Sequence, residues 1–320
     1  MNYNYIIIGA GLSGLTTAKL LAENQCQSIL ILDKSRGVGG RMATRRTLET
    51  RFDHGAQFYR RTADSEYFHQ KWFLEKTTDK WFENEKGEYW KSKNGMTSLA
   101  KSILASMIPN VSIELEKEIC KIEYVQGKWE VTSLKNEKWT CSNLVISSPM
   151  PQTLKLLKSI LNKSLLNHEK LKILEGITYT KALIGLVVCE QEIPLNDFGY
   201  LEYSDSPFFS IASMKKKGLS DLLAYSITMS ADFSEENFEE EDSKTLNIII
   251  DTIQAKFEGV KIITAELKKW RYCMPKNTYN KHSEEIAPRL YLIGDCFGGS
   301  SLLGAIRSGA HLVDSIKNQK

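Results

Sequence analysis

The chain has 320 residues, of which 42% are hydrophobic and 25% charged, with a formal net charge of +3 and a pI near 8.3. This length is enough for two domains, and the weak positive charge does not predict a nucleic-acid partner. No apolar run approaches the roughly 20 residues that cross a bilayer, and no Ser-His-Asp or metal-ligand set is apparent. The six cysteines are scattered, so we expect reduced thiols in a cytoplasmic protein that has no metal and no membrane partner.

The N-terminal segment has the order strand, glycine-rich loop, helix, strand. Residues 5–8 form an apolar, β-branched run, and a GxGxxG motif at residues 9–14 follows it without a gap. Residues 15–22 have a helical pattern, and residues 28–32 form a second apolar run that ends in Asp33. This order is typical of the βαβ unit that binds dinucleotides, and it predicts an α/β fold with a parallel sheet.

Each residue of this motif has a physical task in binding a dinucleotide. Gly9 permits the tight turn, Gly11 lets the backbone approach a pyrophosphate, and Gly14 lets the helix pack closely on the strand. The N-terminus of the helix offers N–H groups and a partial positive charge to the phosphates. Asp33 lies nineteen residues after Gly14, where its carboxylate can accept hydrogen bonds from a ribose diol.

Two further segments indicate FAD, rather than NAD, as the resident cofactor. Residues 34–44 form a loop rich in glycine and arginine where a simple NAD dehydrogenase would continue into a helix, and we expect Arg41 to contact the pyrophosphate. Residues 290–295 have the pattern of a strand that ends in Gly294 and Asp295, and a helical pattern at residues 302–310 follows. An acid at the end of a late parallel strand can hold a ribityl chain and the polar edge of a flavin.

Taken together, these motifs resemble the flavin amine oxidase superfamily of FAD-dependent oxidoreductases and, within it, the renalase-like branch. The likeness extends to residues 53–57, 127–131, 144–151 and 269–271, so it spans almost the whole chain. It implies a Rossmann-type FAD-binding domain like that of glutathione reductase, with a parallel sheet, and a second α+β substrate domain built on an antiparallel sheet. It also implies an oxidase that transfers hydride from 2- or 6-dihydroNAD(P) to FAD and then to O₂, giving NAD(P)⁺ and H₂O₂.

The resemblance implies site residues as well. Gln57 would lie against the flavin, Trp270 would form a pocket wall, and Lys181 would hold a water near flavin N5; these are the predicted catalytic residues. A dihydropyridine that loses a hydride becomes aromatic, so that step needs no general base. For Trp270, core packing is the alternative. The predicted cofactor-binding residues are Gly9, Gly11, Leu12, Ser13, Gly14, Asp33, Lys34, Gly40, Arg41, Met42, Ala56, Gln57, Phe58, Ile119, Gly294, Asp295 and Leu303.

We expect FAD to be held without a covalent bond. Some members of the superfamily tether the flavin through a cysteine that precedes the terminal Gly-Asp motif. Here the stretch between Trp270 and Gly294 contains only Cys273, and the region nearer the motif has no thiol. If a covalent bond did form, Cys273 or His282 would be the attachment point.

The motifs come from both ends of the chain, so the FAD-binding domain is predicted to be discontinuous. It comprises residues 1–60, 94–165 and 270–320, and the substrate domain comprises residues 61–93 and 166–269.

Periodic patterns predict the elements of both domains. Residues 111–115, 118–124 and 128–133 alternate like antiparallel strands, with Gln126 and Gly127 as a turn. Residues 144–148 have the pattern of a buried parallel strand that Pro149 ends. The remaining predicted elements are helices at 97–104 and 243–257 and strands at 182–189, 208–212 and 222–228.

Several charged or polar features have simpler interpretations. The acidic run at residues 234–242 is expected to precede a helix, where carboxylates favour the helix dipole. Residues 215–218, Lys-Lys-Lys-Gly, are interpreted as a solvated turn, with a phosphate clamp as the alternative. Arg45 and Arg51 are compatible with surface charge. His54 is expected to pack rather than face the flavin.

Two other functions remain open from the residues. One is a flavin amine oxidase or desaturase for another small substrate, which should have an aromatic cage of paired Tyr or Trp. Tyr179, Tyr200, Tyr203 and Tyr225 could supply it, but the sequence does not show how they pair. The other is a non-catalytic binding protein on the same fold, against which the intact cofactor motifs argue. A dinucleotide substrate and O₂ are therefore the expected partners.

Overall fold

The computed structural model describes residues 2–107, 109–204 and 206–318. The chain forms two compact units, each assembled from separate stretches: unit 1 is Met1–Gly40, Ala100–Thr178 and Pro275–Lys320, and unit 2 is Arg41–Leu99 and Tyr179–Met274. These boundaries differ from those of the predicted domains, because residues 41–60, 94–99 and 270–274 belong to unit 2 and residues 166–178 to unit 1. The reason is local: the hairpin that follows Gly40 packs on strands and a helix of unit 2.

An eight-stranded sheet forms the core of unit 1, in the order β17–β18–β11–β1–β2–β8, with β10 paired to β11 and β9 paired to β10. Central strand β1 runs parallel to both neighbours, with Ile6 opposite Leu30 and Leu144. Strands buried on both faces are apolar throughout, which explains the predicted N-terminal run. The strands are β1 (Asn2–Ile8), β2 (Ile29–Leu32), β8 (Val111–Glu114), β9 (Ile119–Val125), β10 (Lys128–Ser133), β11 (Lys138–Ile146), β17 (Glu284–Ala287) and β18 (Leu290–Leu292).

The prediction that residues 111–115 belong to an antiparallel set is wrong. β8 pairs with β2 in parallel, with Ile113 opposite Ile31, and ends the parallel part of the sheet. β9 and β10 do form the predicted antiparallel pair, and the turn residues Gln126 and Gly127 both have positive φ. An edge strand of a parallel sheet can alternate in polarity like an antiparallel strand, so the pattern alone does not separate the two.

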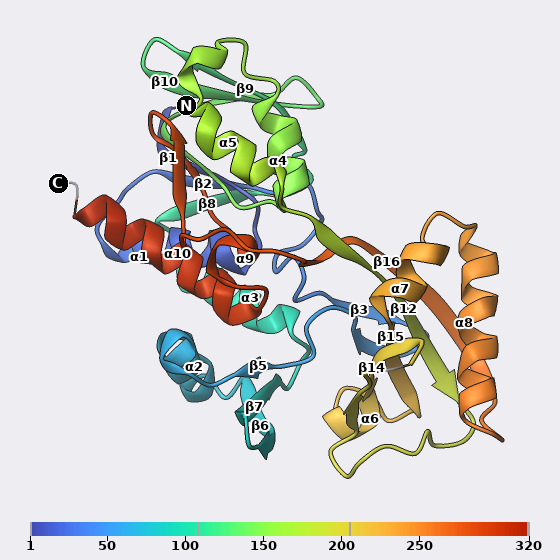
Figure 1. Cartoon of the computed structure of the whole chain (residues 1–320). Helices are drawn as coiled ribbons and strands as arrows, with labels where there is room; N and C mark the ends of the chain where they lie inside the picture. Colours follow the sequence, from blue (N-terminus) through green and yellow to red (C-terminus); the bar gives the residue numbers. More distant parts are fainter. Residues whose placement is uncertain (1, 108, 205, 319–320) are drawn as a thin grey trace. The chain divides into compact units, whose positions relative to one another are not determined.

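Helices α1 and α10 of unit 1 lie side by side (Figure 1). They can approach closely because a Cβ on Gly309 would lie 2.6 Å from the carbonyl oxygen of Ser13. The hydroxyl of Thr17 also donates to the carbonyl of Gly309. The helices of unit 1 are α1 (Leu12–Glu23), α4 (Met150–Leu157), the 3-10 turn η1 (Lys163–Leu165), α5 (His168–Glu175), α9 (Asp295–Gly298) and α10 (Leu302–Lys317), and α3 (Thr97–Ala105) spans the boundary of the two units.

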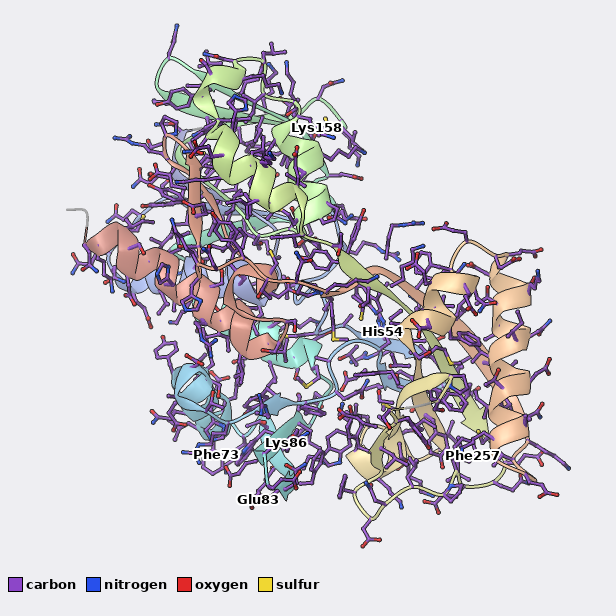
Figure 2. All side chains as sticks on the ribbon, in the orientation of Figure 1. His54, Phe73, Glu83, Lys86, Lys158 and Phe257 are labelled. Atoms are coloured by element: carbon purple, nitrogen blue, oxygen red, sulfur yellow. The ribbon has the colours of Figure 1, made fainter. Side chains whose placement is uncertain are left out.

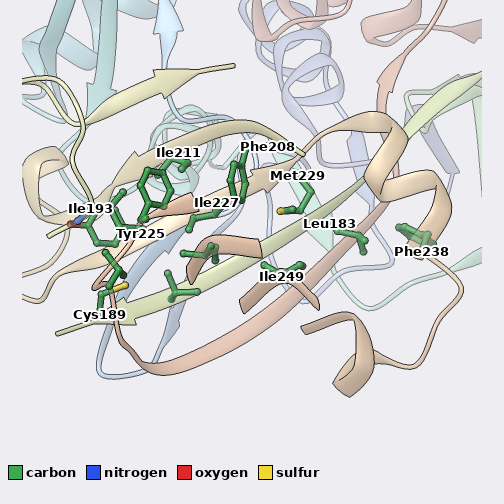
Figure 3. Close-up of a cluster of buried hydrophobic side chains, with 14 residues drawn as sticks. Leu183, Cys189, Ile193, Phe208, Ile211, Tyr225, Ile227, Met229, Phe238 and Ile249 are labelled. Atoms are coloured by element: carbon green, nitrogen blue, oxygen red, sulfur yellow. Dashed lines mark hydrogen bonds between the residues drawn. The ribbon is translucent and has the colours of Figure 1, made fainter. Parts of the chain in front are cut away.

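A five-stranded sheet in the order β13–β14–β15–β12–β16 organises unit 2. Side chains alternate along β12: Leu183 and Val187 join a cluster with α8, shown in Figure 3, whereas Ile184 faces a second cluster on the other side. The predicted antiparallel pairing is confirmed for β12–β15 and β14–β15. The strands of this sheet are β12 (Tyr179–Cys189), β13 (Tyr200–Glu202), β14 (Phe208–Ser213), β15 (Ala224–Met229) and β16 (Ile262–Pro275).

Two smaller sheets complete unit 2, a hairpin β3–β4 and a three-stranded sheet β5–β7–β6. Helix α8 begins at Asp242, the last residue of the acidic run, so the run precedes a helix as predicted, although its first four residues belong to α7. The remaining elements are β3 (Thr44–Thr47), β4 (Thr50–Asp53), β5 (Tyr59–Arg60), β6 (Thr78–Asn84), β7 (Gly87–Ser92), α2 (Ala63–Leu74), α6 (Met214–Lys217), α7 (Ala231–Asn237) and α8 (Asp242–Lys256).

Three searches of the described residues bear on partners and redox state. No helix among them has the length and apolar character needed to traverse a bilayer. No group of three or more His, Cys, Asp or Glu in this part of the chain is placed to hold a metal ion. All six cysteines are free thiols.

Candidate functional site

The glycine-rich turn after β1 leaves one position open to a ligand. Gly9 has a φ of 111°, and a Cβ on Gly14 would lie 2.1 Å from the carbonyl oxygen of Gly9, so the backbone requires glycine at both positions. Nothing lies within 4 Å of the place where a Cβ on Gly11 would be. The open position is therefore the one where the sequence predicts that a pyrophosphate approaches.

The N-terminus of α1 has polar groups without a partner. Its N-cap is Gly11, which has no side chain to accept the first N–H groups of the helix. The hydroxyls of Ser13 and Thr16 are buried, and neither has a hydrogen-bond partner among the described residues. Because buried polar groups are rarely left unpaired, this end of α1 fits the phosphates of a dinucleotide.

Asp33 is held against the same turn by two backbone N–H groups. Its Oδ2 accepts from Ala10 at 2.6 Å, and its Oδ1 accepts from Ser35 at 2.7 Å. A carboxylate has further acceptor sites, so Asp33 keeps capacity for a ribose diol. The N–H of Lys117 donates to the carbonyl of Asp33, which places Ile119 two residues beyond that contact, at the start of β9.

The predicted Gly-Asp motif lies between β18 and α10. Gly294 has a φ of 142°, and its N–H donates to the hydroxyl of Ser308 at 2.9 Å. The next residue, Asp295, begins the short helix α9. A Cβ on Gly304 would lie 1.8 Å from the carbonyl oxygen of Gly299, so the start of α10 packs directly on the loop after α9. Unit 1 therefore contains the glycine motif, Asp33 and the Gly-Asp motif, whereas the predicted cofactor-binding residues from Arg41 to Phe58 belong to unit 2.

Unit 2 contains an ion pair that is completely shielded from solvent. The ammonium of Lys217 lies 2.7 Å from Oδ2 of Asp53, and neither side chain has any exposed surface. Oδ1 of Asp53 accepts the N–H of Met96 and the hydroxyl of Thr44. Burial lowers the pKa of the Lys217 amine, and the Asp53 carboxylate opposes this shift. The carboxylate is thus contacted by partners from three segments of unit 2, with Lys217 as the partner of Oδ2.

The same lysine orients Gln57, a predicted catalytic residue. Lys217 donates to Oε1 of Gln57 at 3.1 Å, and Nε2 of Gln57 donates to the carbonyls of Asp53 and Gly55. Both amide protons of Gln57 are therefore used, and only Oε1 has a lone pair left for a ligand. The ammonium also lies 5.1 Å from the centroid of the Trp81 ring, where a cation is attracted to the aromatic face.

The interpretation of residues 215–218 as a solvated turn is wrong. The segment belongs to the short helix α6, which ends at Gly218 in the left-handed conformation, with φ of 81°. Met214 and Lys217 are buried together, while Lys215 is exposed. Lys217 is thus a residue that the sequence analysis missed. The sequence pattern that could have indicated its burial is an apolar residue three positions before it and, directly after it, a glycine that ends the helix.

The structure pairs Lys181 with two glutamates, and its predicted role near the flavin stays a prediction. The side chains of Lys181 and Leu183 lie on the same face of β12, and this face is covered by α7. The Lys181 ammonium lies 2.9 Å from Glu235 and 3.5 Å from Glu239. Trp270 packs in the cluster on the opposite face of the sheet, so the fold does not bring these two predicted catalytic residues together.

Trp270 instead pairs with His54, which is labelled in Figure 2. Its indole N–H donates to the carbonyl of His54 at 2.8 Å, and the two rings stack with centroids 5.5 Å apart. Burial, with a smaller contribution from Lys268, lowers the pKa of His54 to about 4. His54 thus packs against Trp270, its imidazole is neutral near pH 7, and its position relative to the flavin stays a prediction.

The tyrosines near these residues pair in two geometries, and the Tyr200 ring lies within 19° of parallel with that of Phe82. Tyr179 and Tyr272 meet edge to face, with 78° between their planes, and the guanidinium of Arg41 lies 6.0 Å from the Tyr179 ring. Arg41 also donates to the carbonyl of Cys273 at 2.9 Å. Phe58 contacts Tyr200 edge to face. The pyrophosphate contact of Arg41 stays a prediction.

Sequence and structure comparisons place these features among known proteins. A profile described as "Flavin containing amine oxidoreductase" matches residues 73–316, and one described as "NAD(P)-binding Rossmann-like domain" matches residues 7–73. A putative protoporphyrinogen oxidase from Exiguobacterium sp. 255-15 has a TM-score of 0.76 and 11% identity over 99% of each chain. A putrescine oxidase bound to putrescine has a TM-score of 0.74 and 10% identity, also over 99% of each. A fatty acid isomerase from P. acnes has a TM-score of 0.70 and 11% identity over 98% of each. At these identities the structures share the fold.

Replacing Lys217 tests the buried pair. In Lys217→Met, Asp53 would stay buried without its cation, so the free energy of unfolding should fall by about 3–5 kcal/mol. Urea unfolding followed by circular dichroism measures this change. The exposed neighbour variant Lys215→Met should change it by less than about 0.5 kcal/mol. Adding Asp53→Asn to Lys217→Met should recover much of the loss, and equal losses in the single and double variants would contradict the pairing.

The low pKa of His54 predicts a pH dependence of stability. Between pH 6.5 and about 4 the unfolded chain binds a proton that the folded chain does not, so stability falls with decreasing pH in this window. From pH 7 to pH 5, wild-type protein should lose about 2 kcal/mol more than His54→Phe, which keeps the aromatic stack. His168→Ala, at an exposed histidine, should keep the wild-type slope. If the stability of His54→Phe fell with decreasing pH as steeply as that of the wild type, His54 would not be the group that titrates in this window.

Proposed function

The chain belongs to the flavin-containing amine oxidoreductase family and has FAD as its cofactor, and on this premise we propose that it is a renalase-like oxidase of 2- or 6-dihydroNAD(P). Bound FAD would supply the redox chemistry, taking the hydride and returning its two electrons and one proton to O₂; a second proton from solvent completes H₂O₂, and NAD(P)⁺ is the other product. The substrate class comes from the sequence resemblance, and the polar network around Gln57 supports it.

In this proposal unit 1 holds the nucleotide end of FAD. The open backbone at Gly11, the unpartnered Ser13 hydroxyl and the N-terminus of α1 would bind the pyrophosphate. The carboxylate of Asp33 would accept from the ribose diol, and Gly294 and Asp295 would meet the ribityl chain. We propose that these contacts retain FAD without a covalent bond.

The observation that carries the proposal is that the buried carboxylate beside Gln57 is already engaged in an ion pair. Asp53 is fully buried and paired with Lys217, and Lys217 is shared with Gln57. This network has no spare carboxylate to accept a proton from a substrate. A dihydropyridine loses only a hydride when it becomes aromatic, so its oxidation requires orientation rather than a base.

Gln57 can supply that orientation. Lys217 and two backbone carbonyls hold the Gln57 amide in one position. The remaining lone pair of its Oε1 is then available to accept a hydrogen bond from a ligand. A nicotinamide ring carries a carboxamide N–H₂ that can donate to this oxygen. A ring held in this way presents one edge carbon to the reacting position, and a displacement of about 1 Å can cost on the order of a hundredfold in rate.

The same residues give little support to a cationic amine substrate. An ammonium group would need an available carboxylate or an aromatic cage. Asp53 has no exposed surface, and the guanidinium of Arg41 already lies beside the Tyr179 ring. Because Tyr179 and Tyr272 are nearly perpendicular, they do not form two parallel walls for an amine.

The ribose contact predicts the behaviour of Asp33→Asn. This change keeps the shape of the side chain but removes its charge, and a hydrogen bond to a charged group contributes about 1.5–3 kcal/mol. FAD affinity should therefore fall by about tenfold to a hundredfold in a fluorescence titration of the flavin-free protein. Asp314→Asn, at a surface acid of α10, is the matched control. Unchanged FAD affinity in Asp33→Asn would mean that Asp33 is not the ribose ligand.

Anaerobic mixing with candidate substrates tests the proposed reaction. 6-DihydroNAD should bleach the flavin absorbance quickly, and ordinary NADH should do so at least about tenfold more slowly, because carbon 4 is then held away from the reacting position. Benzylamine and dopamine should leave the flavin oxidised on this timescale. Faster bleaching by an amine than by either dinucleotide would overturn the proposal in favour of an amine oxidase.

A further inference from the structure

A groove in unit 2 lies outside all the residues assigned above. It has a volume of about 400 Å³, within the range of small-molecule sites. One face of helix α2 forms one side of the groove, and strands β6 and β7 form the other side. Phe73, near the end of α2, is 56% exposed (Figure 2). The lining residues are Arg61, Glu66, His69, Gln70, Phe73, Lys80, Glu88 and Trp90.

Three of the lining rings form an aromatic corner. His69 and Phe73 lie within 28° of parallel, and Trp90 stands at 70° to His69 and 84° to Phe73. A flat ring placed in this corner can stack on one wall and meet the other edge to face. Both geometries are favourable for aromatic rings, so the corner suits a planar aromatic ligand.

His69 supplies a polar group at the base of the corner. Its side chain is only 3% exposed, and Nδ1 is hydrogen-bonded to the hydroxyl of Tyr59 at 2.9 Å. Nε2 has no hydrogen-bond partner among the described residues, although His69 lines the groove. Burial, together with Arg61, lowers the pKa of His69, so the imidazole is neutral near pH 7. Nε2 can therefore make one hydrogen bond to a ligand in the groove.

The charges at the rim compensate one another. Arg61 makes a two-pronged pair with Glu66, and Lys80 lies 3.0 Å from Glu88. Two cations and two carboxylates therefore leave the lining without net charge. An anionic or cationic ligand would have to separate one of these pairs, whereas a neutral ligand would not.

We propose that this groove is a binding site for a neutral planar heteroaromatic group, of the size of a nicotinamide or purine ring, that lies in the aromatic corner and hydrogen-bonds to Nε2 of His69. The proposal does not depend on flavin reduction. It is carried by the groove, its three rings and the His69 nitrogen that has no hydrogen-bond partner among the described residues.

Indole N–H signals of ¹⁵N-labelled, FAD-loaded protein test it locally. The chain has six tryptophans, and Trp90→Phe identifies the signal of Trp90. Titration with nicotinamide or adenosine to millimolar concentration should shift the Trp90 signal in a saturable way. Cyclohexanecarboxamide, which has a similar size but no aromatic ring, should not shift it.

Two variants report on the two kinds of contact. Phe73→Ala, at an exposed side chain that should leave the fold intact, should weaken binding about tenfold. His69→Phe keeps an aromatic ring but removes the nitrogen, and it should weaken binding by a similar factor. Tyr67→Ala, an exposed aromatic of α2 outside the groove, should bind as wild type does. No shift of the Trp90 signal with either ligand, or undiminished binding in Phe73→Ala, would overturn the proposal.

Discussion

A lysine and an aspartate buried together organise the chemistry of unit 2. The pair Lys217–Asp53 joins α6 to the end of β4, and Asp53 also binds the backbone before α3 through Met96. Desolvating two charges is costly, so such a pair is weak evidence of net stability, but the loss of one partner is severe. The pair therefore specifies one arrangement of these segments. The orientation of Gln57 depends on this pair, because the Gln57 amide is hydrogen-bonded to Lys217 and to the carbonyl of Asp53.

Unit 1 depends on a different constraint, the approach of one backbone to another. The Gly9 carbonyl lies where a side chain on Gly14 would be, and the Ser13 carbonyl lies where a side chain on Gly309 would be. These contacts pack α1 against β1 and α10 and leave the N-terminus of α1 with polar groups that have no protein partner. In unit 1, glycines thus shape the backbone that is proposed to bind a phosphate. In unit 2, a buried charge pair instead positions the amide of Gln57.

Much of the fold could be predicted from local patterns. The first strand, the glycine motif and α1 were predictable because a strand buried on both faces has a continuous apolar run and the motif has a fixed spacing. The parallel direction of β8 could not be predicted. Polar and apolar residues alternate in any strand that has one exposed face, whichever way its neighbour runs. For Lys181, the sequence located a strand correctly but did not reveal which of its two faces turns toward Trp270. That choice depends on which elements cover each side of the sheet.

The sequence by itself determined the dinucleotide motif, the two-part α/β architecture and the family, since each rests on the order and spacing of neighbouring residues. Only the tertiary structure decided which lysine meets Gln57, because residues 57 and 217 lie 160 positions apart. It likewise decided that His69 has an unpartnered nitrogen beside Trp90, on two elements whose pairing the sequence did not predict. Burial and hydrogen-bond satisfaction are properties of the packed chain, and they convert an ordinary surface residue type such as lysine into an internal, orienting charge.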